Sequence, residues 1–435
     1  MKSIEDILRK IEEDRNSKIL EQKRKEEEIF EIQRRQKEEH LRRVKIYENS
    51  LFQNTNPVAS SSGSFYIDIP DEFYIATLSN SSSLLYYTDS FRTIDLYDYL
   101  DDVNIRNSNE IVRDGSDFYL CGNFGPSDTY FIKLTNCRLK NGVIFHFDKI
   151  EHKVISSYIN YVHGMCFYKG YIYLSSRQDV VIPTADVARI KASNIDEINT
   201  LKLSSDYLNK RTTDIIAYKD YVYIMPSLSS ANGIVVRMDL ALGTYSALIT
   251  TGTSSSPSRR VRTSSAYLIY NDEIFIPIIN NTTGGSGNSQ FGMEVWGLDG
   301  IRKRQVYNQP INTGGATLTP LAHWMGVFND KLIISNAVMG TTTSHRSLVR
   351  MDINTLAIEE SIPMDTLVTD DNSIFSDGYI YLNGELSSFS TNPPKSKIVK
   401  IKYDDFTDRT DLISDLSYLT PNGSYGSLNP TSYIV

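Results

Sequence analysis

The sequence lacks the features that most directly identify an activity. It has three cysteines, Cys121, Cys137 and Cys166, and their spacing matches no metal-binding motif. It also has no nucleophile elbow, phosphate-binding loop, zinc-protease helix or calcium loop. We therefore expect no metal, no other cofactor and no catalytic residues. The simplest interpretation of the cysteines is that they are reduced thiols in the core of a protein made in a cytoplasm.

Other absences limit the partners and the location. No stretch approaches the roughly twenty consecutive apolar residues that a membrane span needs. Charged residues in the segment Met1–Asp6 stand where a signal peptide would need an apolar core, so secretion by that route is not expected. The formal net charge of -8 argues against binding to nucleic acid by bulk electrostatics.

The first 50 residues contain no glycine and no proline, and they are rich in good helix formers. Fourteen Lys/Arg and 13 Asp/Glu nearly balance there, which leaves 31 against 40 for the rest of the chain. A long α-helix over residues 1–52 is therefore predicted. Its apolar residues form a thin stripe with steps of eleven: Leu8, Ile19, Phe30 and Leu41.

An eleven-residue repeat favours straight or slightly right-handed helix packing. A thin apolar stripe on a charged helix needs a partner helix, from an identical subunit or from a larger assembly. We interpret the helix as an oligomerisation or docking element; the alternative is a lone solvated helix. Residues 53–64, rich in Ser and Asn, are expected to be a flexible linker.

From residue 65 on, one short hairpin recurs about every fifty residues. Each copy has Asp, Asn or Gly in a tight turn, followed by aromatic and β-branched residues that suit a half-buried strand. The clearest copies are 168–174, 218–224, 270–276, 328–334 and 376–382, and looser ones are 70–76 and 114–120.

Another apolar strand precedes each turn, and a strand that alternates apolar and polar residues, such as Val187–Lys191, follows the hairpin. A weaker fourth strand can be drawn in most copies, for instance Val143–Phe147. Four antiparallel strands repeated at a fixed period are typical of a β-propeller. We therefore predict an all-β fold over residues 65–435, a seven-bladed propeller preceded by the long helix. Six or eight blades are the alternatives.

Alignment of the hairpins gives the best candidate site. In six copies, the residue five positions before the first residue of the hairpin is polar. These residues are Asn109, His163, Thr213, Ser265, His323 and Asp371. If the first strand of each blade lines a central channel, these residues would form a ring near one mouth of it. The ring is a candidate binding site. The simpler alternative is that it forms a hydrated channel rim without a ligand.

Two further features extend the candidate surface. Trp324 is next to His323, and an exposed ring beside polar residues suits stacking on a sugar, although packing inside its blade is the simpler explanation. The basic segment Arg259–Arg262 suits an anionic polymer such as a phosphate-bearing cell-wall glycan, and a solvated loop is its alternative. The weak binding candidates are therefore His163, His323, Trp324 and Asp371.

A charged helix, a Ser/Asn linker and a Tyr/Asn-rich β domain together resemble the layout of bacteriophage tail proteins. In receptor-binding proteins of some phages that infect Gram-positive bacteria, a helical stem trimerises and carries a propeller that grips cell-wall glycans. Those platforms have fewer blades and further C-terminal domains, so no binding residue is carried over to this chain.

The resemblance implies a non-enzymatic structural or adhesive component of a virion, made in the host cytoplasm. Its expected partners are other tail proteins, further copies of itself and a host cell-surface glycan. Two alternatives stay open: a propeller glycosidase or polysaccharide lyase that uses the polar channel mouth, and a cytoplasmic interaction scaffold.

Overall fold

The computed structural model describes the β part of the chain. The described residues are 59–60, 73–76, 83–87, 91–95, 108–124, 128–136, 138–140, 144–146, 148–160, 162–176, 185–203, 210–228, 233–251, 259–260, 267–281, 289–309, 319–339, 345–365, 367–368, 373–376, 378–386, 395–416, 418–419, 425–426 and 432–433.

The chain divides into two compact units, Met1–Asn56 and Pro57–Val435, and every described residue belongs to the second. The helix predicted over residues 1–52, with Leu8, Ile19, Phe30 and Leu41, lies outside the described residues. The linker predicted over 53–64 is described only at Ala59–Ser60. Within the described ranges all regular elements are strands, and no helix there is long and apolar enough to cross a membrane.

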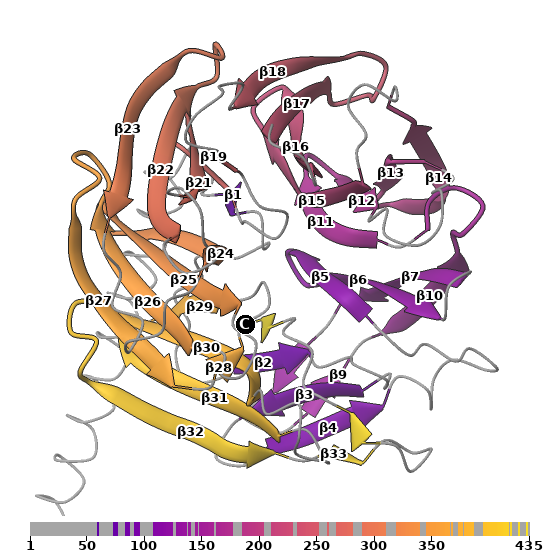
Figure 1. The fold of residues 1–435 in the computed structure, drawn as a ribbon. Coiled ribbons are helices and arrows are strands. Elements are labelled where there is room, and N and C mark those ends of the chain that lie inside the picture. Colours follow the sequence, from indigo (N-terminus) through magenta and orange to yellow (C-terminus); the bar gives the residue numbers. More distant parts are fainter. Residues whose placement is uncertain are drawn as a thin grey trace, which may run out of the picture. The chain divides into compact units, whose positions relative to one another are not determined.

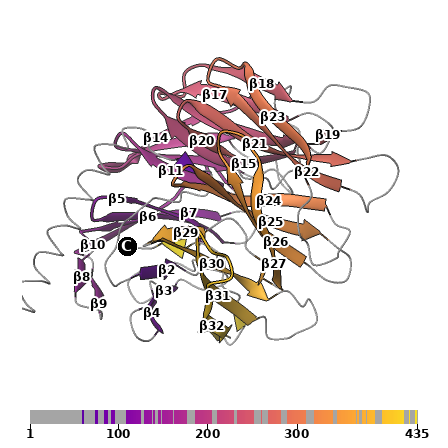
Figure 2. The same cartoon turned by 90° about the vertical axis from the view of Figure 1, so that its left-hand side faces the viewer.

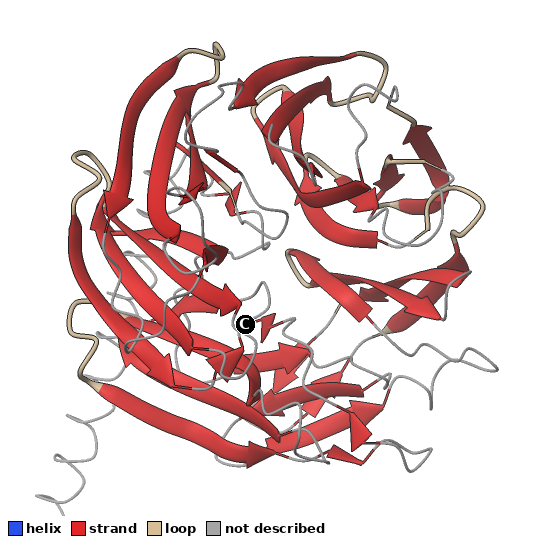
Figure 3. Ribbon diagram, in the orientation of Figure 1, coloured by secondary structure: helices blue, strands red, loops and turns tan. Residues whose placement is uncertain are grey.

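The strands form seven antiparallel sheets of four to six strands each, which we number in chain order (Figures 1 and 3). Sheet 1 contains β2 (Phe73–Ala76), β3 (Ser83–Tyr87), β4 (Phe91–Asp95) and β35 (Ser432–Tyr433). Sheet 2 contains β5 (Ser108–Asp114), β6 (Asp117–Phe124), β7 (Asp128–Thr135) and β10 (Lys149–Val154). Sheet 3 contains β11 (Val162–Tyr168), β12 (Tyr171–Ser176), β13 (Val187–Lys191) and β14 (Asn194–Leu201). Sheet 4 contains β15 (Lys210–Tyr218), β16 (Tyr221–Leu228), β17 (Gly233–Asp239) and β18 (Tyr245–Thr251).

The remaining three sheets follow the same plan, and sheets 5 and 7 have added short strands. Sheet 5 contains β1 (Ala59–Ser60), β19 (Arg259–Arg260), β20 (Leu268–Tyr270), β21 (Glu273–Asn281), β22 (Ser289–Gly297) and β23 (Arg302–Gln309). Sheet 6 contains β24 (Thr319–Phe328), β25 (Lys331–Met339), β26 (His345–Asp352) and β27 (Ile358–Asp365). Sheet 7 contains β28 (Leu367–Val368), β29 (Ser373–Ser376), β30 (Tyr379–Leu386), β31 (Lys395–Lys402) and β32 (Arg409–Leu416). Two small hairpins are separate from these sheets: β8 (Arg138–Lys140) with β9 (Ile144–His146), and β33 (Tyr418–Leu419) with β34 (Tyr425–Gly426).

Consecutive sheets contact one another through their first strands. β5 contacts β11, β11 contacts β15, and β20 contacts β24. The first strands therefore lie on the inner side and the fourth strands on the outer side, as Figures 1 and 2 show. This repeated antiparallel arrangement is propeller-type, so the all-β prediction is confirmed.

The first hairpin of each repeat turns as the sequence predicts. Asn271, Asp272, Asn329 and Asp330 all have positive φ, and Gly170 has a φ of 78°. Two-residue hairpin turns of this kind need the left-handed backbone, which Asn, Asp and Gly adopt at low cost. The turn residues therefore fix which strands pair, and a β-carbon at position 170 would meet no atom within 4 Å, so backbone strain alone would oppose it.

The aromatic residues of the repeated hairpins lie in cores shared between neighbouring sheets. Tyr173 and Tyr223 are each only 1% exposed. The Tyr173 ring packs with Ile215 and Val222 of the next sheet, and Tyr223 packs with Ile269 and further residues of sheet 5. Burial of these rings in the seams joins each repeat to its neighbour.

Basic residues add a second, polar link across the seams. Sheets 2, 3, 4 and 6 each carry a cation at the same position of the third strand. Each cation donates a hydrogen bond to the carbonyl of the residue that directly follows the third strand of the next sheet. The four pairs are Lys133 to Ala192 (2.7 Å), Arg189 to Leu240 (2.8 Å), Arg237 to Leu298 (3.4 Å) and Arg350 to Tyr403 (2.8 Å).

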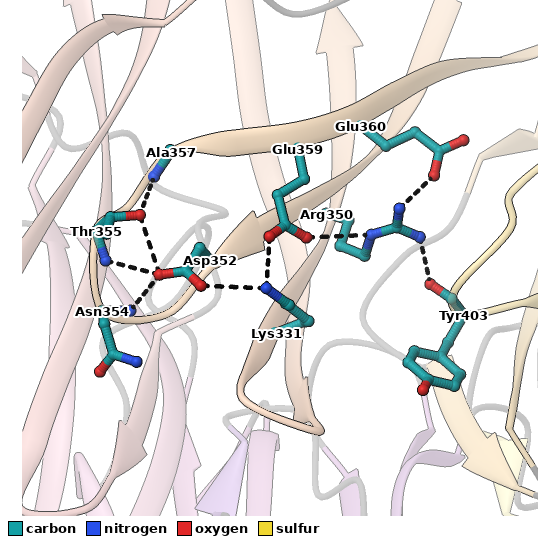
Figure 4. A network of polar contacts seen from close by, with 9 residues as sticks. All are labelled: Lys331, Arg350, Asp352, Asn354, Thr355, Ala357, Glu359, Glu360 and Tyr403. Atoms are coloured by element: carbon teal, nitrogen blue, oxygen red, sulfur yellow. Dashed lines mark hydrogen bonds and ion pairs between the residues drawn. The ribbon is translucent and has the colours of Figure 1, made fainter.

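Figure 4 shows the link between sheets 6 and 7 with its surroundings. The Arg350 guanidinium also pairs with Glu359 at 3.4 Å and Glu360 at 2.9 Å, both on β27 of its own sheet. Lys331 pairs with Asp352 at 3.1 Å and with Glu359. These acidic groups hold the Arg350 fork in place while it reaches the Tyr403 carbonyl.

One seam is built differently. The position of these cations is occupied in sheet 5 by Val295, which is fully buried. The seam between sheets 5 and 6 instead holds a large apolar cluster that includes Phe275, Phe291, Met325 and Met351. The described residues therefore show four seams joined by a basic residue and one joined mainly by apolar burial.

The two ends of this unit are paired within it. In sheet 1, Tyr433 of β35 is opposite Tyr74 of β2, and Ser432 is opposite Ile75. The final segment thus supplies a strand to the first sheet. β1 pairs with β20, so Ala59–Ser60 adds a short strand to the inner edge of sheet 5.

Candidate active site

A β-bulge interrupts the inner strand of four sheets at the same place. In β11 the pairing shifts between Val162 and Gly164, so His163 is the extra residue. In β24 it shifts between Ala322 and Trp324, so His323 is the extra residue. In β5 the extra residue is Asn109, and in β15 the shift spans Thr213 and Asp214.

These bulges coincide with the polar positions found by aligning the hairpins. Bulges are over-represented next to active sites, where they change the direction of a side chain and end regular pairing. Ser265 and Asp371, the other two aligned residues, lie outside the described residues. The binding roles of His163, His323, Trp324 and Asp371 stay predictions.

The two histidine bulges share one further feature. Gly164, which follows His163, is paired with Ser175, and Trp324, which follows His323, is paired with Ser335. Both serines are buried. The corresponding residue of sheet 2 is Cys121, so a serine at this register position accompanies the histidines.

A second buried hydroxyl lies beside the His163 bulge. Ser176 is opposite Val162, is fully buried, and its Oγ has no hydrogen-bond partner. Leaving a buried hydroxyl unpaired costs about 1–3 kcal/mol. The inner end of sheet 3 therefore contains a buried polar group that the described residues leave unsatisfied.

The tyrosines near the seams do not supply proton transfer at neutral pH. Burial raises the pKa of Tyr173 to about 12, although the nearby Arg189 guanidinium opposes the shift. The Tyr173 hydroxyl stays protonated and donates to the Leu240 carbonyl at 3.0 Å. Burial also raises the pKa of Tyr119 and Tyr223. We therefore give these tyrosines a structural role in the seams between sheets.

The two tryptophans differ in how far the structure defines them. Trp296 is partly buried against the core between sheets 4 and 5, and its Nε1 donates to Glu294 at 3.0 Å. Trp324 is placed by its register next to the His323 bulge. In the described part of the chain, no group of three or more His, Cys, Asp and Glu could hold a metal ion.

Reading single strands missed both the seam cations and the bulges. The cations are visible in the sequence as a basic residue at one position of the alternating third strands, as in Val187–Lys191, but the alternation alone indicates only a strand with one covered face. Their acceptors lie 51–61 residues away in the chain, in the next sheet. A comparison of the third strands across repeats, in addition to the hairpins, could have found them.

No family model and no curated protein matches this sequence. Several solved structures resemble its fold. A proposed 6-phosphogluconolactonase from Bacteroides fragilis is 10% identical, with a TM-score of 0.47 over 84% of this chain and 98% of that one. A puromycin hydrolase is 9% identical, with a TM-score of 0.44 over 86% of this chain and 58% of that one. A thermostable family-43 glycoside hydrolase is 11% identical, with a TM-score of 0.38 over 60% of this chain and 94% of that one.

These comparisons contradict the prediction of a non-enzymatic virion component, because the solved structures that the chain resembles are described as a lactonase and hydrolases. We therefore correct both the structural or adhesive function and the expectation that the chain is not an enzyme. At these identities and TM-scores the likeness concerns the fold alone. The reaction is accordingly argued from the residues of this chain.

Proposed function

We propose that this chain is a polysaccharide-active enzyme, a glycosidase or a lyase, with its active site at the bulged ends of the inner strands. The observation that carries the proposal is the recurrence of a bulge at a polar residue on four inner strands, with histidine in sheets 3 and 6. Figure 1 shows β11 and β24 on different sides of the centre, so a bound glycan would lie between strands that each carry one histidine.

Histidine suits the chemistry because its ordinary pKa of about 6.5 allows it to accept or donate a proton near neutral pH. Cleavage of a glycosidic bond needs two proton transfers. One histidine would take a proton from the attacking water, or from a sugar carbon in an elimination. The other would give a proton to the glycosidic oxygen as its bond to carbon breaks.

The two histidine bulges share a local feature, because Ser175 and Ser335 accompany them at equivalent register positions. Both serines are buried, and the Ser175 hydroxyl donates to the Gly164 carbonyl at 3.5 Å, so we assign them to the structure of the bulged strand ends.

The test is turnover on a panel of polysaccharides, read as new reducing ends for hydrolysis and as ultraviolet absorbance of unsaturated products for elimination. His163→Ala and His323→Ala should each lower the rate by about 10²–10⁴-fold, as loss of general acid–base catalysis does. The control is His152→Ala, because His152 is exposed on β10, the outermost strand of sheet 2. Product formation that survives both histidine variants, or no product from the wild-type chain, would overturn the proposal.

The proposal includes the finer architecture. The seven sheets would be seven blades of one closed ring, with β35 completing sheet 1. Electron-microscopy averages of the β unit viewed along its axis should show seven wedges. Six or eight wedges would contradict this count.

A further inference from the structure

The inner edges of sheets 4 and 5 each carry two consecutive basic residues, and these occupy the same register positions in both sheets. β15 begins with Lys210 and Arg211, and β19 consists of Arg259 and Arg260. Both segments pair with the second strand of their own sheet, β16 in sheet 4 and β21 in sheet 5. β19 and β1 lie on the inner side of sheet 5 in Figure 1.

The register makes the correspondence specific. Arg211 is opposite Ser227 and Lys210 is opposite Leu228. Arg260 is opposite Ile279 and Arg259 is opposite Asn280. The second strands of the two sheets align Ile224 with Ile276, so Ser227 corresponds to Ile279 and Leu228 to Asn280. The four basic residues therefore occupy the same two rows on neighbouring sheets.

These rows lie at the end of the inner strands that also holds the bulges. In β15, Lys210 and Arg211 directly precede Thr212, where the pairing shift begins. The same rows in sheet 6 hold Pro320 and Leu321, which are opposite Val338 and Ala337. The basic residues are thus a local feature of sheets 4 and 5, and not a general feature of the inner strands.

The two edges carry four basic residues at the end of the strands that holds the bulges, in contrast with the chain's net charge of -8. Consecutive residues of a strand alternate between its two faces, so each pair places one basic residue on each face of its sheet. An anionic polymer that passes this end of the two edges is therefore attracted from both faces. Arg and Lys are also the residues that bind carboxylates and phosphates through charge-assisted hydrogen bonds.

We propose that Lys210, Arg211, Arg259 and Arg260 form the recognition surface for an anionic polysaccharide, with carboxylate or phosphate groups along the polymer. This inference rests on the proposed function, because it places the charged rows beside the active site and names the class of its substrate. The polymer lies with its anionic groups over sheets 4 and 5 while the bond to be cleaved reaches the histidine bulges of the adjoining sheets.

The experiment measures binding of the full chain to matched polymers by calorimetry. Polygalacturonate is compared with its fully methyl-esterified form, which keeps the sugar backbone and loses the charge. A poly(glycerol phosphate) arm distinguishes phosphate from carboxylate recognition. The wild-type chain should bind at least one anionic polymer more tightly than the neutral one, and that binding should weaken as salt is raised, because salt screens the charges.

The variants are Arg259→Gln with Arg260→Gln, and separately Lys210→Gln with Arg211→Gln. Each pair should weaken binding of the anionic polymer by about tenfold or more, since hydrogen bonds to charged groups are among the stronger ones. Neutral polymer binding should not change. The matched control is Lys149→Gln with Lys303→Gln, which removes the same charge from β10 and β23, the outermost strands of their sheets.

The outcomes separate the two proposals. Turnover of a polysaccharide that is unaffected by either basic pair, with equal binding of charged and neutral polymers, overturns this inference and leaves the enzyme proposal intact. Anionic binding that is lost with both basic pairs, without turnover of any polymer, supports the recognition surface and overturns the enzyme proposal. Equal losses in the basic pairs and in the control also overturn the inference, because they would reflect net charge alone. Two independent pairs keep the test valid if one variant fails to fold.

Discussion

Replacing Arg350 by methionine tests whether the basic residues hold neighbouring sheets together. The change removes the 2.8 Å hydrogen bond to the Tyr403 carbonyl and the ion pairs with Glu359 and Glu360. It keeps an unbranched apolar stem that can still pack near the Phe406 ring, over which the guanidinium lies at 5.2 Å. The lost groups therefore dominate the expected effect.

The magnitude follows from these contacts. A hydrogen bond to a charged group contributes about 1.5–3 kcal/mol, and each partly exposed ion pair adds about 0.2–1 kcal/mol. We expect Arg350→Met to lower the free energy of unfolding by about 3 kcal/mol. An unfolding entropy of about 2.1 cal/mol/K per residue over the unit Pro57–Val435 then gives a fall in Tm of about 4 °C.

The measurement is differential scanning calorimetry beside a matched control. Lys402→Met makes a comparable change next to the same carbonyl, but Lys402 is 41% exposed and pairs at 3.4 Å with Asp404, which is 50% exposed. Its Tm should move by less than about 1 °C. Equal shifts for the two variants would refute the idea that the link between sheets, and not the loss of any cation, stabilises the fold.

Three further predictions follow. Hydrogen bonds from the Thr355 amide and from Lys331 lower the pKa of Asp352 from 3.8 to about 2. The contribution of the Asp352 carboxylate to stability is therefore present above pH 4 and is lost as the pH falls through 2. The difference in unfolding free energy between wild type and Asp352→Asn should shrink over that window, and a constant difference would contradict the assignment. Tyr173→Phe removes one hydrogen bond to the Leu240 carbonyl, which Arg189 still satisfies, so denaturant unfolding should show a loss of only about 1 kcal/mol. Deleting residues 1–52 should convert a discrete oligomer into a monomer in light scattering, and an intact chain that is already monomeric would show that the predicted helix awaits a different protein.

The sequence was sufficient for the repeat because the information there is local. A turn residue such as Gly170 or Asp330 and the strand that follows it lie within seven residues of each other, and the structure pairs them as the pattern predicts. Arg350 and Tyr403 are 53 residues apart, and no property of either residue alone indicates the other. The seam links are therefore visible only when the sheets are placed side by side.

The candidate site shows the same limit in a milder form. Aligning the hairpins selected His163 and His323 as polar residues at equivalent positions. Only pairing with β12 and β25 shows that both are bulge residues with a serine at the same neighbouring position. The basic rows needed the register of two sheets as well, because three strands, β16, β17 and β18, separate Arg211 from Arg260 in the sequence.

Sheet 5 has Val295 at the position where four other sheets have a linking basic residue. The joints between the sheets of this domain should therefore respond unequally to salt. Four described joints rely partly on charge, and concentrated salt weakens them by screening. The joint between sheets 5 and 6 relies mainly on oily side chains, with a hydrogen bond between Tyr270 and Asp330, and it loses strength on cooling as the hydrophobic effect fades. High salt would therefore weaken the four charged joints and leave this one unchanged, whereas cooling would weaken the apolar clusters of all of them.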